Sequence, residues 1–343
     1  MDPRRTSITL PHSTVSTLEW RPECESAVPV LLLHGGGADS AELSWGAVGA
    51  ALAAAGHHVF APDHPGFGRS ARAEWPLTQE RLVRHVGELV DGLGLHDYAI
   101  AGLSLGGGMT LGHLLDQPGR ARSAVLLGCY GLMPRLADGL VGRITHFGTF
   151  MLLRTGLLAA MTRSYARNRS AMERGLGDLV RTPQARTPEL VEAVLTEAAV
   201  GTGLETFAQW QHNQVLWNRL RTLYTPHLPS ITTPTLLVHG DRDSGVPLAR
   251  IRTAAELLPA GSLVTAPGAG AIVRTSSSPR CSTTWRGPPM PRPRVPDRRD
   301  RILDAAEELV LAHGFDAMSV ASIADRAGIG KGAVYLEFAG KRE

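Results

Sequence analysis

Short apolar runs alternate with helical stretches through the first half of the chain, and this alternation is the strongest constraint on the fold. The runs VPVLLLHG (28–35), HVFAPD (58–63), YAIAGLS (98–104) and SAVLLGCYG (123–131) are typical of buried parallel strands. Helical patterns lie between them, and Thr78 is placed to N-cap the one at 78–94. The chain therefore predicts an α/β fold, in which helices cover both faces of a doubly wound, mostly parallel sheet.

The alternation stops between about residues 132 and 229, where the sequence is helical and gives no strand signal. It resumes with TPTLLVHGDRD (233–243), a helical stretch at 247–258 and the strand SLVTAP (262–267). A helical insertion between two strands of such a sheet predicts a cap over a site. The pattern fits a purely structural subdomain equally well.

Composition narrows the class of protein. Lys and Arg number 35 against 32 Asp and Glu, a balance that neither favours nor excludes an anionic partner. The three cysteines, Cys24, Cys129 and Cys281, are far apart and lack CxxC spacing, so we expect no disulfide framework and no metal or other cofactor. The N-terminus has no apolar signal region, and the most apolar stretch (147–161) is interrupted by Arg154 and shorter than the roughly 20 residues of a membrane span. We expect a cytoplasmic protein with no membrane partner.

The segment AGLSLGGG (101–108) carries the clearest chemical signal. It contains the pattern G-x-S-x-G around Ser104, directly after a predicted strand and at the start of a predicted helix. Such a turn lifts the serine hydroxyl above the strand ends, and the N–H of Leu105 at the helix N-terminus points at a developing oxyanion. We therefore predict Ser104 as a nucleophile; the alternative is a glycine-rich turn that serves close packing alone.

A second oxyanion donor is expected from LLLHGGGADS (31–40), a glycine-rich loop after an earlier strand. Glycines let the backbone approach a substrate closely, and the N–H of Gly36 is the predicted donor. His34 stands on this loop, and its position predicts a bracing role in preference to that of a general base.

Taken together, residues 7 to about 270 resemble an α/β-hydrolase-fold enzyme. The resemblance rests on LLLHGGG, FAPDHPGFGRS, AGLSLGGG and PTLLVHGDRDSGVP, in that order. It implies a serine nucleophile, an acid after a late strand and a histidine after the last strand. By position the acid is Asp243, with Asp241 as the alternative and a salt-bridging role open to either. The resemblance also implies a small-molecule substrate, namely a carboxylic ester or a related acyl or carbon–carbon bond compound.

The histidine of that triad is missing. The family's last strand leads into a phrase like PGAGH, and this chain has PGAGA, with Ala271 in the histidine's place. No histidine occurs between His239 and His313, and His64, His212 and His227 lie in the loop and cap regions. Because the base must reach both Ser104 and the acid, we do not expect any of these three to replace it, and we predict impaired activity.

A shift of the reading frame accounts for the missing histidine. Ala271 and Ile272 are encoded by GCN and ATH, and a C as the third base of the first codon gives the histidine codon CAT. Under GC-rich codon choices, the same frame turns the following residues into Arg-Pro-Asp-Glu, which is a normal tail for the family. We predict that the frame shifts near Gly270 and that residues 271 to about 289 are out-of-frame translation.

The C-terminal part is a different object. Residues 271–298 hold six prolines without periodicity and predict a disordered Pro/Arg/Ser-rich linker. Residues 299–343 resemble a truncated tetracycline-repressor (TetR) type helix-turn-helix, a small all-α fragment in which VASIADRA (320–327) is the second helix. The resemblance implies that Lys331, Gly332 and Tyr335 face DNA, with Lys341 near the phosphate backbone.

A DNA-binding transcriptional regulator is thus the alternative function of the chain. An ordinary three-helix packing unit is the alternative structure of its C-terminal part. Met290 could be the start codon of a separate regulator gene joined to the hydrolase.

Overall fold

The computed structural model describes residues 1–24, 27–270, 305 and 320–327. Two compact units are present, Met1–Met290 and Pro291–Glu343, and each is considered by itself. Several predicted features lie outside the described residues: Ala271, the linker at 271–298, and Lys331, Gly332, Tyr335 and Lys341.

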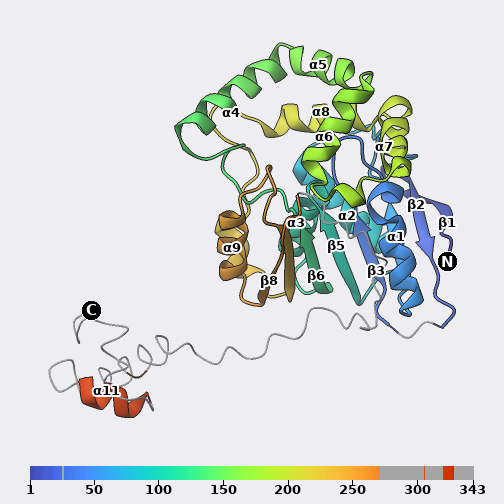
Figure 1. The fold of residues 1–343 in the computed structure, drawn as a ribbon. Helices are drawn as coiled ribbons and strands as arrows, with labels where there is room; N and C mark the ends of the chain where they lie inside the picture. The colour runs from blue at the N-terminus through green and yellow to red at the C-terminus, as the bar shows by residue number, and fades with distance from the viewer. Residues whose placement is uncertain (25–26, 271–304, 306–319, 328–343) are drawn as a thin grey trace. The chain divides into compact units, whose positions relative to one another are not determined.

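The first unit is built on an eight-stranded sheet with the spatial order β1-β2-β4-β3-β5-β6-β7-β8 (Figure 1). The pairs β1–β2 and β2–β4 are antiparallel, and all others are parallel, which confirms the predicted mostly parallel sheet. The strands are β1 (Arg4–Leu10), β2 (Ser13–Trp20), β3 (Val30–Leu33), β4 (Val59–Pro62), β5 (Tyr98–Leu103), β6 (Ala121–Leu127), β7 (Thr235–Gly240) and β8 (Gly261–Ala266).

The hairpin of β1 and β2 was not predicted. In β1 the apolar Ile8 and Leu10 alternate with polar residues, which is the period of a strand with one buried face, whereas the last six residues of β2 are all buried. Leu10 and Val15 of the hairpin pack with Leu89 in a small buried cluster of their own. The hairpin therefore extends the parallel sheet with an antiparallel edge.

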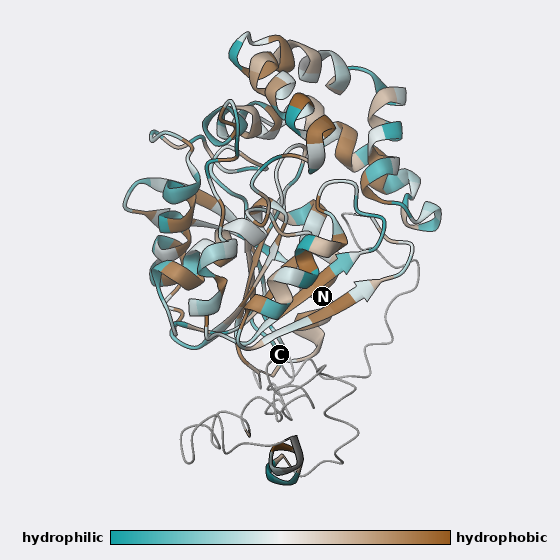
Figure 2. Ribbon diagram, turned by 90° about the vertical axis from the view of Figure 1, so that its left-hand side faces the viewer, coloured by the Kyte–Doolittle hydropathy of each residue, from teal (hydrophilic) through white to brown (hydrophobic). Residues whose placement is uncertain are grey.

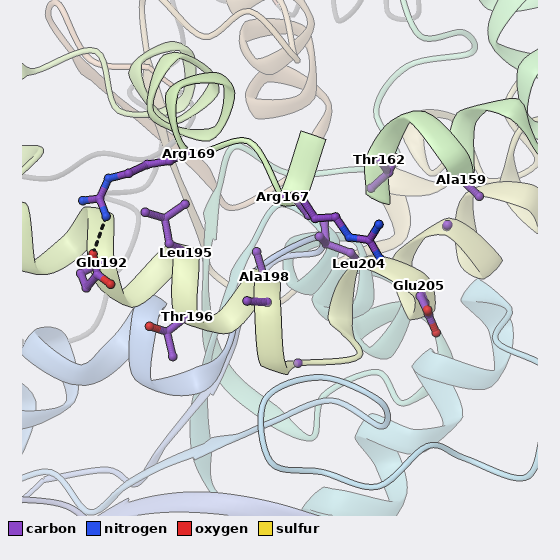
Figure 3. A pocket seen from close by; sticks show the side chains of 14 residues that line it. Ala159, Thr162, Arg167, Arg169, Glu192, Leu195, Thr196, Ala198, Leu204 and Glu205 are labelled. Atoms are coloured by element: carbon purple, nitrogen blue, oxygen red, sulfur yellow. Dashed lines mark hydrogen bonds and ion pairs between the residues drawn. The ribbon is translucent and has the colours of Figure 1, made fainter. Parts of the chain in front are cut away.

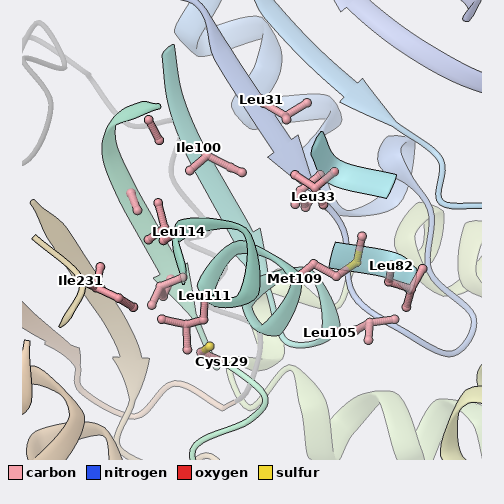
Figure 4. Close-up of a cluster of buried hydrophobic side chains, with 14 of the residues drawn as sticks. Leu31, Leu33, Leu82, Ile100, Leu105, Met109, Leu111, Leu114, Cys129 and Ile231 are labelled. Carbon is pink, nitrogen blue, oxygen red and sulfur yellow. The ribbon is translucent and has the colours of Figure 1, made fainter. Parts of the chain in front are cut away.

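Helices cover the sheet on both faces. They are α1 (Ala41–Ala54), α2 (Gln79–Gly92), α3 (Leu105–Asp116) and α9 (Leu248–Leu257). The larger core cluster joins the sheet to α2 and α3, through residues such as Leu82 and Met109 (Figure 4), and to α9 through Ile251. A second cluster joins α1 to the opposite face, where Trp45 packs with Trp20. Two separate apolar layers on one sheet are the mark of the doubly wound architecture.

Five helices stand between β6 and β7 and form the cap, residues 139–214 (Figure 1). They are α4 (Gly139–Arg154), α5 (Leu157–Ala166), α6 (Arg169–Leu179), α7 (Pro188–Val200) and α8 (Gly203–Gln214), with 3₁₀ turns η1 (Pro183–Ala185) and η2 (Thr225–Ser230). Among the described residues no single helix is long and apolar enough to cross a membrane. Helices α4 and α5 meet that criterion only as a pair, and they are bent by 86° relative to each other.

One part of the sheet has no helix over it among the described residues. The register aligns Leu103, Leu127, Val238 and Val264 in one row across β5 to β8, and Leu103 belongs to the cluster under α1. Along this row, burial decreases until Val264 is 52% exposed. Parallel sheets are normally covered on both faces, so this uncovered face is a departure from the usual architecture within the described residues.

In the second unit, the structure describes Ala305 and the helix α11 (Val320–Arg326). The helix coincides with the predicted second helix of the C-terminal fragment. Ile323, Ala324 and Ala327 are buried, whereas Asp325 and Arg326 are exposed, so the short helix has one buried apolar side.

The predicted cap of α2 gives a test of local stability. The Thr78 side chain accepts a hydrogen bond from the N–H of Arg81 at 3.2 Å, which satisfies one of the free donors of the first turn. We expect Thr78→Ala to lower the free energy of unfolding by about 1 kcal/mol in urea denaturation. Thr78→Ser should retain most of it because it keeps the acceptor oxygen. An equal loss in both variants would contradict the capping role.

Candidate active site

Ser104 occupies a strained turn between β5 and α3. Its φ of 49° and ψ of −109° make it the one non-glycine residue with positive φ in the described part of the chain. Three backbone hydrogen bonds hold it there: its N–H donates to Leu127, and its carbonyl accepts from Gly108 and Tyr130, at 2.8, 3.0 and 3.0 Å. The side chain is exposed although the flanking residues are buried. Strain of this kind persists only where the surroundings over-determine it, and it gathers at functional sites.

The two glycines of G-x-S-x-G are required by close backbone contacts. A Cβ on Gly102 would overlap the carbonyl group of Gly106. A Cβ on Gly106 would overlap the carbonyl of Leu33, at the end of β3. Helix α3 can therefore begin directly beside the loop that follows β3 only because both positions lack a side chain.

That loop, residues 34–37, is the predicted second oxyanion element. The N–H of Gly35 donates to a carboxylate oxygen of Asp39 at 2.7 Å. Asp39 lies just before α1 in the chain, so this bond fixes the glycine loop to the start of that helix. A Cβ placed on Gly35 would lie 3.7 Å from the Cβ of Ser104, so the loop and the serine are neighbours. The Gly36 N–H forms no hydrogen bond with the described residues and remains available to a ligand. Asp39 was not identified from the sequence, although its place five residues after His34 on the glycine loop was visible there.

His34 and His64 form a buried stacked pair behind the loop, with ring centroids 3.9 Å apart. The Nδ1 of His34 donates to the carbonyl of Gly35 at 2.8 Å, and its Nε2 accepts from the N–H of His64 at 2.9 Å. The Nε2 of His64 donates to the carbonyl of His34. Burial lowers the pKa of His34 to about 3 and that of His64 well below its usual range, so both rings are neutral at physiological pH. Their hydrogen bonds brace the loop.

The two candidate acids after β7 have different surroundings. The Asp243 side chain is only 2% exposed, and one of its oxygens accepts from the N–H groups of Gly245 and Val246 at 2.6 and 3.2 Å. Its other oxygen lies 3.7 Å from Nε2 of His239, a contact that the sequence did not suggest. Asp241, in contrast, is exposed and accepts from the N–H of Gly268 at 2.7 Å.

The bond from Gly268 to Asp241 positions the loop after β8. A second bond, from the N–H of Arg242 to the carbonyl of Ala269 at 2.9 Å, strengthens it. A Cβ on Gly240 would overlap the carbonyls of Ala269 and Gly270, so these segments touch. The chain thus reaches residue 270 beside the loop that carries Asp243, and residue 271 comes next.

The other histidines are occupied elsewhere. Nε2 of His212 lies 3.0 Å from a guanidinium nitrogen of Arg154, within the cap. His227 lies on η2, where its backbone N–H donates to the carbonyl of Tyr224, and its imidazole makes no hydrogen bond with the described residues. Nε2 of His239 donates to the carbonyl of Val246 at 2.9 Å. None of these side chains makes a hydrogen bond with Ser104 within the described structure.

Helix α8 places the cap on the loops of the site. Thr202 and Thr206 both donate to the carbonyl of Gly66, at 2.6 and 3.0 Å, and Phe207 packs against Gly36. The opposite side of α8 contributes Leu204 and Ala208 to a cavity of about 670 Å³ inside the cap (Figure 3). Since Ser104, Gly36 and Asp243 do not line this cavity, it is separate from the predicted catalytic site.

No group of three or more His, Cys, Asp or Glu side chains suited to a metal ion is present in the described ranges.

A family model described as alpha/beta hydrolase fold matches residues 28–273. The chain belongs to this family.

The α/β hydrolase has named relatives. A 2-hydroxymuconate semialdehyde hydrolase of Pseudomonas putida is 30% identical over 241 residues, which cover 68% of this chain and 77% of that protein. A 2-hydroxy-6-oxo-6-(2'-aminophenyl)hexa-2,4-dienoic acid hydrolase of Metapseudomonas resinovorans is 28% identical over 232 residues, 66% of this chain and 71% of that protein.

Solved structures share the fold of the α/β hydrolase. A serine hydrolase involved in carbazole degradation, the CarC enzyme, aligns with a TM-score of 0.62 at 20% identity, covering 79% of this chain and 92% of that one. A second family model, for bacterial regulatory proteins of the tetR family, matches residues 302–343. Both predicted families are therefore present in one chain.

The contact between the glycine loop and the cap can be tested by a double-mutant cycle. A Cβ on Gly36 would overlap the ring of Phe207, which is itself stacked on Trp210. We expect Gly36→Ala to destabilise the α/β hydrolase by about 1–3 kcal/mol through overpacking. In a Phe207→Ala background the same change should cost much less, because the obstructing ring is gone. Urea denaturation of all four proteins measures the coupling, and strictly additive effects would show that the loop and the ring do not compete for space.

Proposed function

We propose that the hydrolase part of this chain is a serine hydrolase for carboxylic esters or related acyl and carbon–carbon bond substrates, and that its activity is impaired because residue 271 is not histidine. The observation that carries the first half is the exposed Ser104 at positive φ, at the N-terminus of a buried helix. The second half rests on the sequence after Gly270.

Each remaining group has a role in this proposal. The Ser104 hydroxyl attacks the substrate carbonyl, and the N–H groups of Gly36 and Leu105 receive the resulting oxyanion. Asp243, held by two backbone N–H groups, orients the base and stabilises its charged form. Asp241 is assigned to the loop because its carboxylate is already bonded to Gly268.

Without a base, the proton of Ser104 has no acceptor in the site. His34 and His64 cannot take it, because burial keeps their pKa values far below the physiological range and their hydrogen bonds point into the loop. Transition-state stabilisation by the oxyanion donors and substrate binding remain. Together these sustain only a small fraction of the full catalytic rate.

We further propose that the frame shift near Gly270 removed two things at once, the base and the following helix. The loop up to Gly270 retains its bonds to Asp241 and Arg242, which supports a recent and local change. The bare face beside Val238 and Val264 supports a lost covering element, since it lies where a segment after β8 would pack. The nucleotide sequence across codons 269–272 tests this directly.

The named relatives narrow the substrate class. Both act, by name, on unsaturated 2-hydroxy acids or semialdehydes with a carbonyl group along the chain. We therefore assign to this chain substrates of the 2-hydroxy-6-oxodienoic acid type, in which hydrolysis breaks a carbon–carbon bond. Simple activated esters serve as general probes of the serine.

The activity proposal predicts a large difference between two versions of the protein. The chain as encoded should hydrolyse 4-nitrophenyl acetate and a 2-hydroxy-6-oxodienoate roughly four to six orders of magnitude more slowly than a version whose frame is restored after Gly270. Steady-state kcat and KM for both substrates measure the effect. Robust hydrolysis by the unaltered chain that disappears in Ser104→Ala would contradict it and reveal another base.

Within the restored version, the two aspartates form a matched pair. Asp243→Asn should reduce kcat by several orders of magnitude, because the base loses its orienting carboxylate. Asp241→Asn should affect stability more than kcat. A larger loss of kcat in Asp241→Asn than in Asp243→Asn would show that Asp241 orients the base and that Asp243 holds the loop.

The match of residues 302–343 to the tetR family favours a second candidate function, DNA binding. We propose that this part binds DNA through Lys331, Gly332, Tyr335 and Lys341, with Lys341 on the phosphate backbone. Since helix-turn-helix proteins read paired half-sites as dimers, a single module offers few phosphate contacts and little discrimination.

Salt dependence distinguishes weak from specific DNA binding. For the full chain we expect dissociation constants of roughly 10⁻⁴ to 10⁻⁶ M on palindromic and scrambled duplexes alike, weakening steeply as salt rises. Lys331→Ala should weaken binding about equally on every sequence, whereas Tyr335→Ala should change discrimination only in a true operator reader. Nanomolar, sequence-selective binding at physiological salt would make the regulator the better description.

A further inference from the structure

The outer helices of the cap expose an unusual number of large apolar side chains. Eight of the thirteen that are exposed in the described residues lie on α4 and α5. The most exposed are Val141 at 76%, Leu140 at 72% and Ile144 at 67%. These two helices lie at the edge of the cap farthest from the sheet, and their apolar segments are visible in the hydropathy view (Figures 1 and 2).

On α4 the exposed residues form a continuous stripe. Four of the five, Leu140, Ile144, Phe147 and Met151, have the spacing of one helix face, and Val141 is next to Leu140 in the chain. The buried residues Gly142, His146 and Leu153 lie on the opposite face. Nε2 of His146 donates to the carbonyl of Leu216 at 2.7 Å and so anchors that inner face to the rest of the cap. The stripe is therefore held outward by the packing of the helix.

Helix α5 carries a second exposed apolar face. Leu157, Met161 and Tyr165 are 52%, 52% and 38% exposed and follow the same helical spacing. The bend of 86° between α4 and α5 excludes a continuous membrane-spanning rod, but two helices joined in this way can lie together on a flat surface. The apolar surface of α4 and α5 is named the outer stripe below.

The charge around the outer stripe has one sign. Residues 139–172 contain no Asp or Glu and five arginines, at positions 143, 154, 163, 167 and 169. Arg143 and Arg167 form no ion pair within the described part of the chain. Arg169 is balanced by Glu173 and Glu192, which lie beyond the acid-free segment. Arg167 lines the cap cavity together with Glu192 and Glu205, so the cation that the stripe itself offers beside its exposed hydrocarbon is Arg143.

Large exposed apolar patches mark interaction sites, and the charge selects the partner. A second copy of the chain would bring two arginine-rich surfaces together with no acid from either segment to offset the repulsion. An anionic lipid surface satisfies both features, because arginines attract its headgroups while Leu, Phe and Met side chains enter the acyl boundary. We propose that the outer stripe binds an anionic phospholipid bilayer at its interface, without crossing it.

This inference differs from the sequence expectation of no membrane partner. That expectation tested only for a spanning segment and for a signal peptide. An interfacial helix is distinguished by which face its apolar residues occupy, and this became visible only when the buried face of α4 was known.

Vesicle co-sedimentation with the full chain tests the proposal. The protein should sediment with vesicles of phosphatidylcholine containing phosphatidylserine and remain in solution with phosphatidylcholine alone. Ile144→Ser combined with Phe147→Ser should reduce the partition coefficient roughly tenfold or more, because two side chains no longer leave water. Arg143→Gln should reduce it about fivefold and weaken its salt dependence. Val48→Ser, at an exposed apolar site on α1, is the control and should leave binding unchanged.

Tryptophan fluorescence and the oligomeric state separate lipid binding from association with a second copy of the chain. Phe147→Trp should give a blue-shifted emission on anionic vesicles, which shows that this position leaves water. Thermal unfolding of every variant should match the parent, since the substituted side chains are exposed. Equal binding to neutral vesicles, or no binding to either, would overturn the proposal. Concentration-dependent dimers that Ile144→Ser and Phe147→Ser abolish would instead assign the stripe to a second copy.

Discussion

The start of α3 against the end of β3 is the contact on which the site depends. Two glycines allow it, because a Cβ on Gly102 or Gly106 would overlap backbone carbonyl groups. The resulting turn forces Ser104 into a positive φ, and hydrogen bonds to Leu127 and Tyr130 tie it to the end of β6. The strain is local, but strands, helix and glycine loop all have to be in place to sustain it. Nucleophile geometry here is therefore a property of the whole central sheet.

Much of this arrangement could be predicted from the sequence because its signals are local. Buried strands read as unbroken apolar runs, and the G-x-S-x-G turn and the Thr78 cap each depend on a few adjacent residues. The edge hairpin β1–β2 was missed although its alternation was present, because short alternating segments without a turn signature compete poorly with longer patterns. Contacts between distant segments were also missed. Nothing near Phe207 indicates that its ring closes over Gly36, and nothing near Asp241 indicates that it bonds to Gly268.

The parts of the proposed catalytic site are preserved to different degrees. The glycine loop, the Ser104 turn and the loop after β7 retain their hydrogen bonds, while residue 271 is Ala where the proposed function requires histidine. If Gly36 and Leu105 act as proposed, the site would still favour a tetrahedral oxyanion over a planar carbonyl. Such a site would retain transition-state-like ligands. The outer stripe on α4 and α5 would add a second kind of retention, at a lipid surface, without involving the serine.

The bare face of β6 to β8 has a consequence for how this protein persists in a cell. Val264 is 52% exposed and Val238 is half-buried, so within the described residues these parallel strands present apolar surface of the kind that proteins expose while folding. If that surface is uncovered in the whole molecule, a folded copy would resemble an incompletely folded one. Its abundance would then depend on chaperones and proteases as much as on its chemistry.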